Sequence, residues 1–308
     1  MFMRKLALLA KIETVYGTDS TPTGAANSIL ARNVNINPLE LEEEDRNIQQ
    51  PYLGNSGKIV TSFSGGIDFE VEIAGAGAAG TVPKYGPLLR GCSFAEAITA
   101  GVKVAYTLVS SGFESLVMYY NLDGARHIFT GSRGSVEMGL NAKGIPVYKF
   151  AFKGIFNQVI DAALPTAVYT GFVTPLAVGK VNTPTFTLHA YAAVMKALSI
   201  NVANQVVYRN LVNYEGVDNV DRQPVGSVEI ESTLAATKAW FAIAKDKTPG
   251  ALNLVHGITA GNIVQIQAPN VLLSQPKYSD VDGIVMLTAN LELMPTAAGN
   301  DELTIEVR

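Results

Sequence analysis

Apolar and polar residues alternate along many stretches of the chain. The strictest alternation covers residues 67–73, where apolar side chains occupy every second position and acidic ones stand between them: Asp68, Glu70 and Glu72. Because strand side chains point alternately to the two faces of a sheet, this pattern predicts a strand with one apolar and one acidic face. Similar patterns predict strands at residues 29–36, 103–109, 116–122, 125–129, 135–140, 146–156, 196–202, 206–210, 262–267 and 283–293.

Other stretches predict turns, helices and loops. Asp123-Gly124 stands between two strand-like runs and predicts a two-residue hairpin turn. Short helices are predicted at residues 83–92, with Pro83 near the start, and at 234–244, where the pattern is amphipathic. Residues 6–12 are expected to form another short helix. Residues 38–58 are read as a long polar loop, and the proline-containing residues 157–185 as a linker.

The order of predicted elements repeats after the linker. Residues 226–232 resemble 66–72, and residues 283–293 match 144–154 in place and pattern. Each half therefore contains strand, long loop, strand, helix and further strands, which suggests an internal duplication. The expected fold is mainly β, in an α+β sense, with two tandem β-sandwich or barrel-like domains, each flanked by one helix. The predicted boundaries are an N-terminal arm (1–29), a first domain (30–157), a linker (158–185) and a second domain (186–308).

Composition restricts the kind of partner that the chain can have. Hydrophobic residues make up 48% and charged residues 16% of the chain, and the charged share lies below the roughly 25% of typical soluble domains. Such a surface suggests burial against other copies of the chain. The net charge of −4 and the absence of basic clusters argue against binding nucleic acid. No apolar run approaches the ~18 residues of a membrane span, so a protein without a membrane segment, made in the cytoplasm, is expected.

No pattern of residues predicts catalysis, a cofactor or a metal ion. The three histidines lie far apart in sequence, and the single Cys92 is typical of a small buried hydrophobe. Residues 75–80 match GxGxxG, yet no long helix follows, which favours a flexible link over a dinucleotide site. The acidic run beginning at Glu40 lacks the ligand spacing of a calcium loop, which favours a solvated or inter-subunit loop. A non-enzymatic protein is therefore expected.

Several segments together resemble the major tail tube proteins of long-tailed, siphovirus-like bacteriophages and related prophages. The resemblance spans most of the chain, and its opening segment is the most specific part. The strands alone would be weak indicators. The segments that carry it are LAKIETVYGTDSTPTGAAN (9–27), RNVNI (32–36), Arg46 with PYLG (51–54), YGPLLRGC (85–92) and GNDELTIEVR (299–308).

The resemblance implies a virion protein that stacks as rings into a tube for DNA delivery. Three duplicated chains would then make a ring with pseudo-sixfold symmetry, although a second domain is also compatible with an outward decoration. DNA would slide past a repelling wall without specific contacts. The candidate lumen residues are Asp68, Glu70, Glu72, Glu229 and Glu231, for which an ordinary solvated face is the alternative. Tail terminator, tape-measure and distal tail proteins are the implied partners. Candidate inter-subunit contacts are Tyr16, Asp19, Glu40, Glu42, Glu43, Glu44, Asp45, Arg46 and Tyr52, with residues 40–46 expected between rings.

Three other classes of function stay open at this level. The first is another phage structural part, such as a tail terminator, a sheath-associated tube or a capsid decoration protein. A carbohydrate-binding β-sandwich would need exposed aromatic clusters, and the lone Trp240 on an apolar helix face argues against it. A hydrolase with an unusual site is the third.

Overall fold

The computed structural model describes residues 1–308, which form one 16-stranded sheet, a separate two-stranded sheet and three short helices. Strands hold 54% of the residues and helices 5%, which confirms the mainly-β class and agrees with a β-sandwich. The first half contains β1 (Leu6–Ile12), α1 (Gly24–Asn27), β2 (Ser28–Ile29), β3 (Arg32–Asp45), β4 (Lys58–Glu72), α2 (Gly86–Gly91), β5 (Phe94–Thr99), β6 (Lys103–Leu108), β7 (Leu116–Leu122), β8 (Ala125–Asn141) and β9 (Val147–Asp161). The second half contains β10 (Thr185–Leu188), β11 (Met195–Asn201), β12 (Asn204–Leu211), β13 (Tyr214–Arg222), β14 (Val225–Glu231), α3 (Trp240–Lys245), β15 (Gly250–His256), β16 (Val264–Val281), β17 (Ile284–Met294) and β18 (Thr304–Val307).

Eight long strands form a continuous antiparallel run, β3-β4-β9-β8-β11-β14-β17-β16. One face of this run is apolar and belongs to a core cluster of 49 buried residues. Phe69, Phe150 and Phe152 stack there with ring centroids 5.5–6.0 Å apart. The strict alternation of residues 67–73 therefore places apolar side chains in the core and leaves the acidic ones on the opposite face.

The two halves repeat the same order of strand pairing. In the first half the order is β1-β7-β8-β9-β4-β3, and in the second it is β10-β15-β16-β17-β14-β11. In each half a short helix follows the strand that ends in an acidic residue, Glu72 or Glu231. The halves join edge to edge where β8 pairs with β11, and a second time where β18 pairs with β6.

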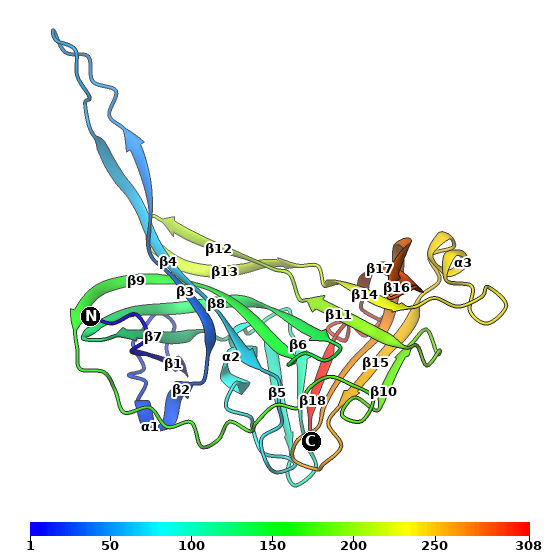
Figure 1. Ribbon diagram of the computed structural model, residues 1–308. Coiled ribbons are helices and arrows are strands. Elements are labelled where there is room, and N and C mark those ends of the chain that lie inside the picture. Colours follow the sequence, from blue (N-terminus) through cyan, green and yellow to red (C-terminus); the bar gives the residue numbers. More distant parts are fainter.

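Two hairpins leave the body of the sheet in different ways. The outer part of β3–β4 projects into solvent, whereas β12–β13 lies along β8 and β9 of the first half (Figure 1). Arg133 of β8 holds the second hairpin through its guanidinium, 2.8 Å from the Val217 carbonyl and 3.2 Å from Asp218. The outer part of the β3–β4 hairpin has no comparable contact with another part of the chain.

Three local predictions are wrong. Residues 6–12 form strand β1 between β2 and β7, because Ala7 to Ala10 are all buried and a helix would leave one side of them in water. The predicted loop at 38–58 is largely hairpin, with strand β3 reaching Asp45 through irregularities in its register. Helix α3 begins only at Trp240, so residues 234–239 of the predicted helix 234–244 are not helical.

The predicted turn at residues 123–124 is present, whereas the predicted flexible link at residues 75–80 is not. Asp123-Gly124 does form the tight turn between β7 and β8, with both residues at positive φ. The GxGxxG segment, however, is packed and is not a free link. The Gly75 N–H donates to Asn262 Oδ1 at 2.8 Å, and a Cβ on Gly75 would stand 2.1 Å from the Gly261 carbonyl oxygen. Its glycines therefore allow close backbone contact between the two halves.

Candidate functional site: a polar sheet face and a projecting hairpin

The polar face of the eight-strand run gathers all the residues that the sequence predicts for a lumen. Asp68 and Glu231 are exposed, and Glu70, Glu72 and Glu229 are half-buried. Glu70 and Glu72 of β4 occupy the places in the first half that Glu229 and Glu231 of β14 occupy in the second. The register within each strand fixes this orientation, because the alternate residues are buried in the core.

Cations that sequence reasoning did not assign lie on the same face. Arg32 contacts Glu70 at 3.1 Å, and Lys196 contacts Glu229 at 2.9 Å, so the same ion pair occurs in both halves. Lys149 pairs with Glu137 on the neighbouring strand at 3.1 Å. The alternation of residues 148–153 could have predicted that Lys149 and Lys153 lie on the polar face. The alternate positions hold the aromatic residues Tyr148, Phe150 and Phe152. The face carries both signs of charge.

Two carboxyls at the base of the projecting hairpin have opposite pKa shifts. Lys153 Nζ donates a hydrogen bond to the Glu40 carboxylate at 2.9 Å, and this hydrogen bond lowers the pKa of Glu40. Asp68 lacks such a partner. Although part of this residue is exposed, its carboxyl has lost some of its hydration, and this desolvation, with the nearby charge of Glu40, raises the pKa of Asp68. Glu40 therefore stabilises the fold above its unfolded pKa and loses this contribution as pH falls through its folded pKa. Asp68 opposes folding at neutral pH, and protonation relieves this as pH falls.

Replacing Lys153 with Met should raise the titration midpoint of Glu40, because the carboxylate then loses its charged donor. Side-chain carboxyl NMR during a pH titration measures both midpoints. Lys149→Met is the matched control, since Lys149 pairs with Glu137 and should leave the Glu40 midpoint unchanged. An unchanged midpoint in Lys153→Met would contradict the assigned cause.

The acidic run lies on the projecting hairpin rather than in a loop. Glu42 accepts a hydrogen bond from Ser62 at 2.6 Å, and Glu43 lies 3.7 Å from Lys58 across the hairpin. Further members of the predicted contact set are exposed on the outer half of the hairpin or at its tip: Glu44, Asp45, Arg46 and Tyr52. Apolar side chains are exposed beside them, among them Leu39, Leu41, Ile59, Val60 and Phe63. A surface that mixes exposed apolar and acidic residues is typical of a contact surface.

The other two predicted contact residues have partners within the chain. The Tyr16 hydroxyl accepts a hydrogen bond from the Val217 N–H at 2.6 Å, and the Arg133 guanidinium lies over its ring at 4.9 Å. Asp19 accepts a hydrogen bond from the Tyr119 hydroxyl at 2.5 Å. The segment after β1 therefore ties the N-terminal region to the β12–β13 hairpin of the second half.

Tyr16→Phe should lower the free energy of unfolding by about 1–3 kcal/mol, because the Val217 N–H would lose its partner in a partly buried place. Urea denaturation followed by circular dichroism measures this difference. Tyr52→Phe, at the exposed hairpin tip, is the control and should have no measurable effect. Equal stability of the two variants would show that the Tyr16 hydroxyl does not hold the hairpin.

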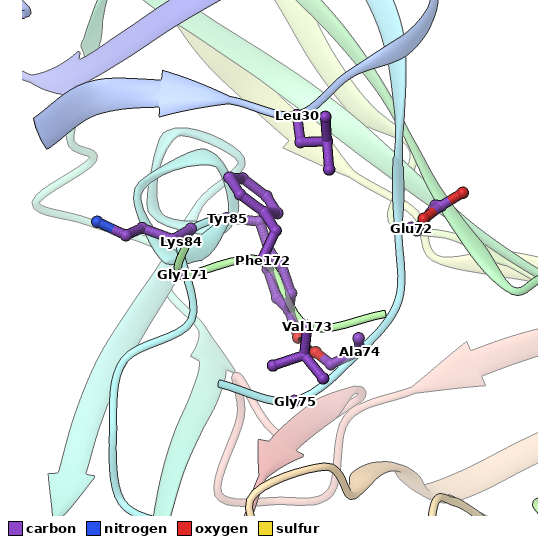
Figure 2. Close-up of a pocket in the computed structure, with 9 residues that line it drawn as sticks. All are labelled: Leu30, Glu72, Ala74, Gly75, Lys84, Tyr85, Gly171, Phe172 and Val173. Atoms are coloured by element: carbon purple, nitrogen blue, oxygen red, sulfur yellow. Dashed lines mark hydrogen bonds between the residues drawn. The ribbon is translucent and has the colours of Figure 1, made fainter. Parts of the chain in front are cut away.

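The cleft that residues 171–173 close is too small for a substrate. Phe172 and Val173 lie over Tyr85, which directly precedes α2, and over Ala74, just after β4 (Figure 2). The Tyr85 hydroxyl donates to the Ala74 carbonyl at 2.7 Å. The space between them holds about 10 Å³, which is room for one water molecule. The segment that follows β9 is thus packed on the first half at this point.

Comparison with known proteins bears on the family of the chain. No helix has the length and apolar character needed to cross a membrane. A search of curated proteins finds no significant match. A family model described as "Phage tail tube protein" matches residues 3–295, nearly the whole chain. Members of this structural family are components of the virion tail and assemble with themselves and other tail proteins. The chain therefore belongs to the phage tail tube protein family.

Proposed function

We propose that the chain is the repeating subunit of a phage tail tube, in which copies close into rings, rings stack, and DNA passes through the lumen. The observation that carries this proposal is the eight-strand run with two equivalent units, open at both ends and polar on one face. A ring needs an interface whose two sides differ and repeat around an axis. The repeated pairing order supports an internal duplication, so that three chains would supply six equivalent units.

The polar face is the proposed wall of the lumen. Asp68, Glu72 and Glu231 lie there with the ion pairs of Glu70 and Glu229. Carboxylates repel the phosphates of DNA, and the cations near them are held in ion pairs, so no strong attraction would hold DNA at one position. This is avoidance of DNA and involves no specific binding. Tail terminator, tape-measure and distal tail proteins would bind the ends and interior of the tube, after synthesis in the host cytoplasm.

The primary test is negative-stain electron microscopy of the purified protein, with size-exclusion chromatography alongside. Hollow tubes or stacked rings are expected, and averages of end-on rings should show six repeats built from three chains. A small closed oligomer that never stacks would contradict the proposal and favour a terminator or decoration protein. Six chains in each ring would contradict the trimeric arrangement alone.

The outer half of the β3–β4 hairpin is the proposed contact with a copy in the same or an adjacent ring. Reversal of three charges, Glu42→Lys, Glu43→Lys and Glu44→Lys together, should leave a soluble folded chain and impair tube formation. These side chains are exposed, and the contacts of Glu42 with Ser62 and of Glu43 with Lys58 lie within the projecting hairpin, so the core does not depend on them. Electron microscopy counts the tubes, and circular dichroism checks the fold. Tubes of normal length and number from the triple variant would exclude this role.

A further inference from the structure

The eight-strand run ends in two unpaired strand edges. β3 pairs only with β4, and its other edge is free. In β16, residues up to Val271 pair with β15, whereas residues 272–281 pair only with β17. Free edges present unsatisfied N–H and C=O groups and are ready sites for adding a strand from another chain.

The chain contains one completed junction of the same kind. β11 of the second half adds antiparallel to the outer half of β8 in the first, with Ser199 opposite Gly139 and Ile200 opposite Met138. β11 is the second-half equivalent of β3, and β8 is the first-half equivalent of β16, by their places in the repeated pairing order. The β8–β11 junction is therefore a template for a junction between β16 and β3.

The register of this second junction follows from the sheet itself. Glu72 pairs with Val147 and Glu231 with Met286, so Val147 and Met286 are equivalent. Gly139 is opposite Val147, and Ser279 is opposite Met286. Gly139 of the template thus corresponds to Ser279.

The same steps locate the other side of the junction. Ser199 is opposite Ser227, and Asn35 is opposite Asp68, and the alignment of Glu72 with Glu231 makes Ser227 and Asp68 equivalent. Ser199 of the template thus corresponds to Asn35. The next residue matches as well, since Ile200 corresponds to Ile36.

The burial of equivalent residues shows what the free edges lack. At the template junction, Leu198 and Ile200 are 1% and 0% exposed. Their equivalents Val34 and Ile36 are only partly buried. Across the junction, Met138 is 0% exposed, whereas its equivalent Tyr278 is 62% exposed. The β8–β11 contact covers such side chains. At the free edges Tyr278 has the ring of Phe241 beside it, at 5.1 Å between centroids, and no strand pairs with the outer edge of β3.

We propose that the free edge of β3 in one copy adds antiparallel to residues 272–281 of β16 in the next copy. Asn35 then stands opposite Ser279, and Ile36 opposite Tyr278. This inference rests on the proposed function and names the strands and register that close the ring. The occupant is a second copy of this chain, because only a strand with the pattern of β11 reproduces the template. Each copy uses one edge to donate and the other to accept, which is the heterologous arrangement that rings require.

Cysteine cross-linking tests the register. The double variant Asn35→Cys with Ser279→Cys places two thiols directly opposite each other, at a Cα separation of about 4.5–5.5 Å, within reach of a disulfide. Cys92 is fully buried, and burial raises the pKa of its thiol, so it need not be replaced. The control is Asn35→Cys with Thr288→Cys, because Thr288 lies on the next strand, β17, roughly 5 Å further away.

Mild oxidation of the first variant should give covalent dimers and trimers on non-reducing gels, with no larger species, and the control should give none. Electron microscopy of the same samples before oxidation separates this inference from the tube function. Tubes without Asn35–Ser279 cross-links would overturn the junction and leave the tube intact. Cross-linked trimers without tubes would support the junction and overturn the tube. Monomers with neither would overturn both.

Discussion

Ile36→Lys and Tyr278→Lys are each expected to give folded chains that build no tubes, whereas an equimolar mixture of the two forms dimers. Each substitution places a lysine on one side of the proposed β3–β16 junction and leaves the other side intact. Edge charges prevent strand addition because their desolvation opposes pairing. In the mixture, the intact β3 of Tyr278→Lys meets the intact β16 of Ile36→Lys, and the chain of contacts stops after one junction. Size-exclusion chromatography with light scattering measures the masses.

The matched control is Ile160→Lys, at a residue of β9 that is 43% exposed and lies outside both edges. This variant should assemble as the parent chain does. Failure of the mixture to form dimers, with both single variants folded, would exclude a head-to-tail junction between these two strands. An interface that uses the same surface on both copies would instead give dimers of one variant by itself, without the mixture.

Phe150→Ala is expected to lower the free energy of unfolding by about 3–5 kcal/mol, because it removes a buried ring from the core and leaves a cavity. Phe150 is 2% exposed and stacks on Phe69 at 5.5 Å and on Phe152 at 5.9 Å. Urea denaturation of the dispersed chain, followed by circular dichroism, measures the change. The midpoint should fall with little change in the slope of the transition.

Phe2→Ala is the control for the same chemical change, since Phe2 is 65% exposed near the N-terminus. Its stability should stay within about 0.5 kcal/mol of the parent chain, as is usual at exposed sites. A similar loss in both variants would mean that the aromatic stack of the sheet does not dominate the core.

The sequence determined which residues enter the core and which stay on the polar face. Strict alternation at residues 67–73 places Phe69 inside and Asp68 outside, since the period of a strand leaves no other choice. The turn at Asp123-Gly124 was equally predictable, because an Asp-Gly pair suits a hairpin turn that needs positive φ at both residues, and both adopt it there. The resemblance in residues 9–27 led to the right family, and a family model confirms it.

Other features needed the tertiary structure. Residues 6–12 have an apolar run that suits either a helix or a buried strand, and only pairing with β7 decides for the strand. The polar residues 38–45 form a strand because β4 supplies hydrogen-bonding partners, which no local pattern reveals. Tyr16 and Asp19 lie in a loop-like stretch, yet their partners Val217 and Tyr119 lie about 201 and 100 residues away.

The sequence by itself thus determined side-chain alternation, turn chemistry and family, because each depends on residues close together in the chain. Strand neighbours, the Lys and Arg partners of the acidic face, and the position of the β3–β4 hairpin were decided only by the tertiary structure. Pairing across a sheet joins residues that are distant in sequence, and many partners of similar pattern compete for each edge. The packed core selects among them, and it leaves open the outer edge of β3 and residues 272–281 of β16.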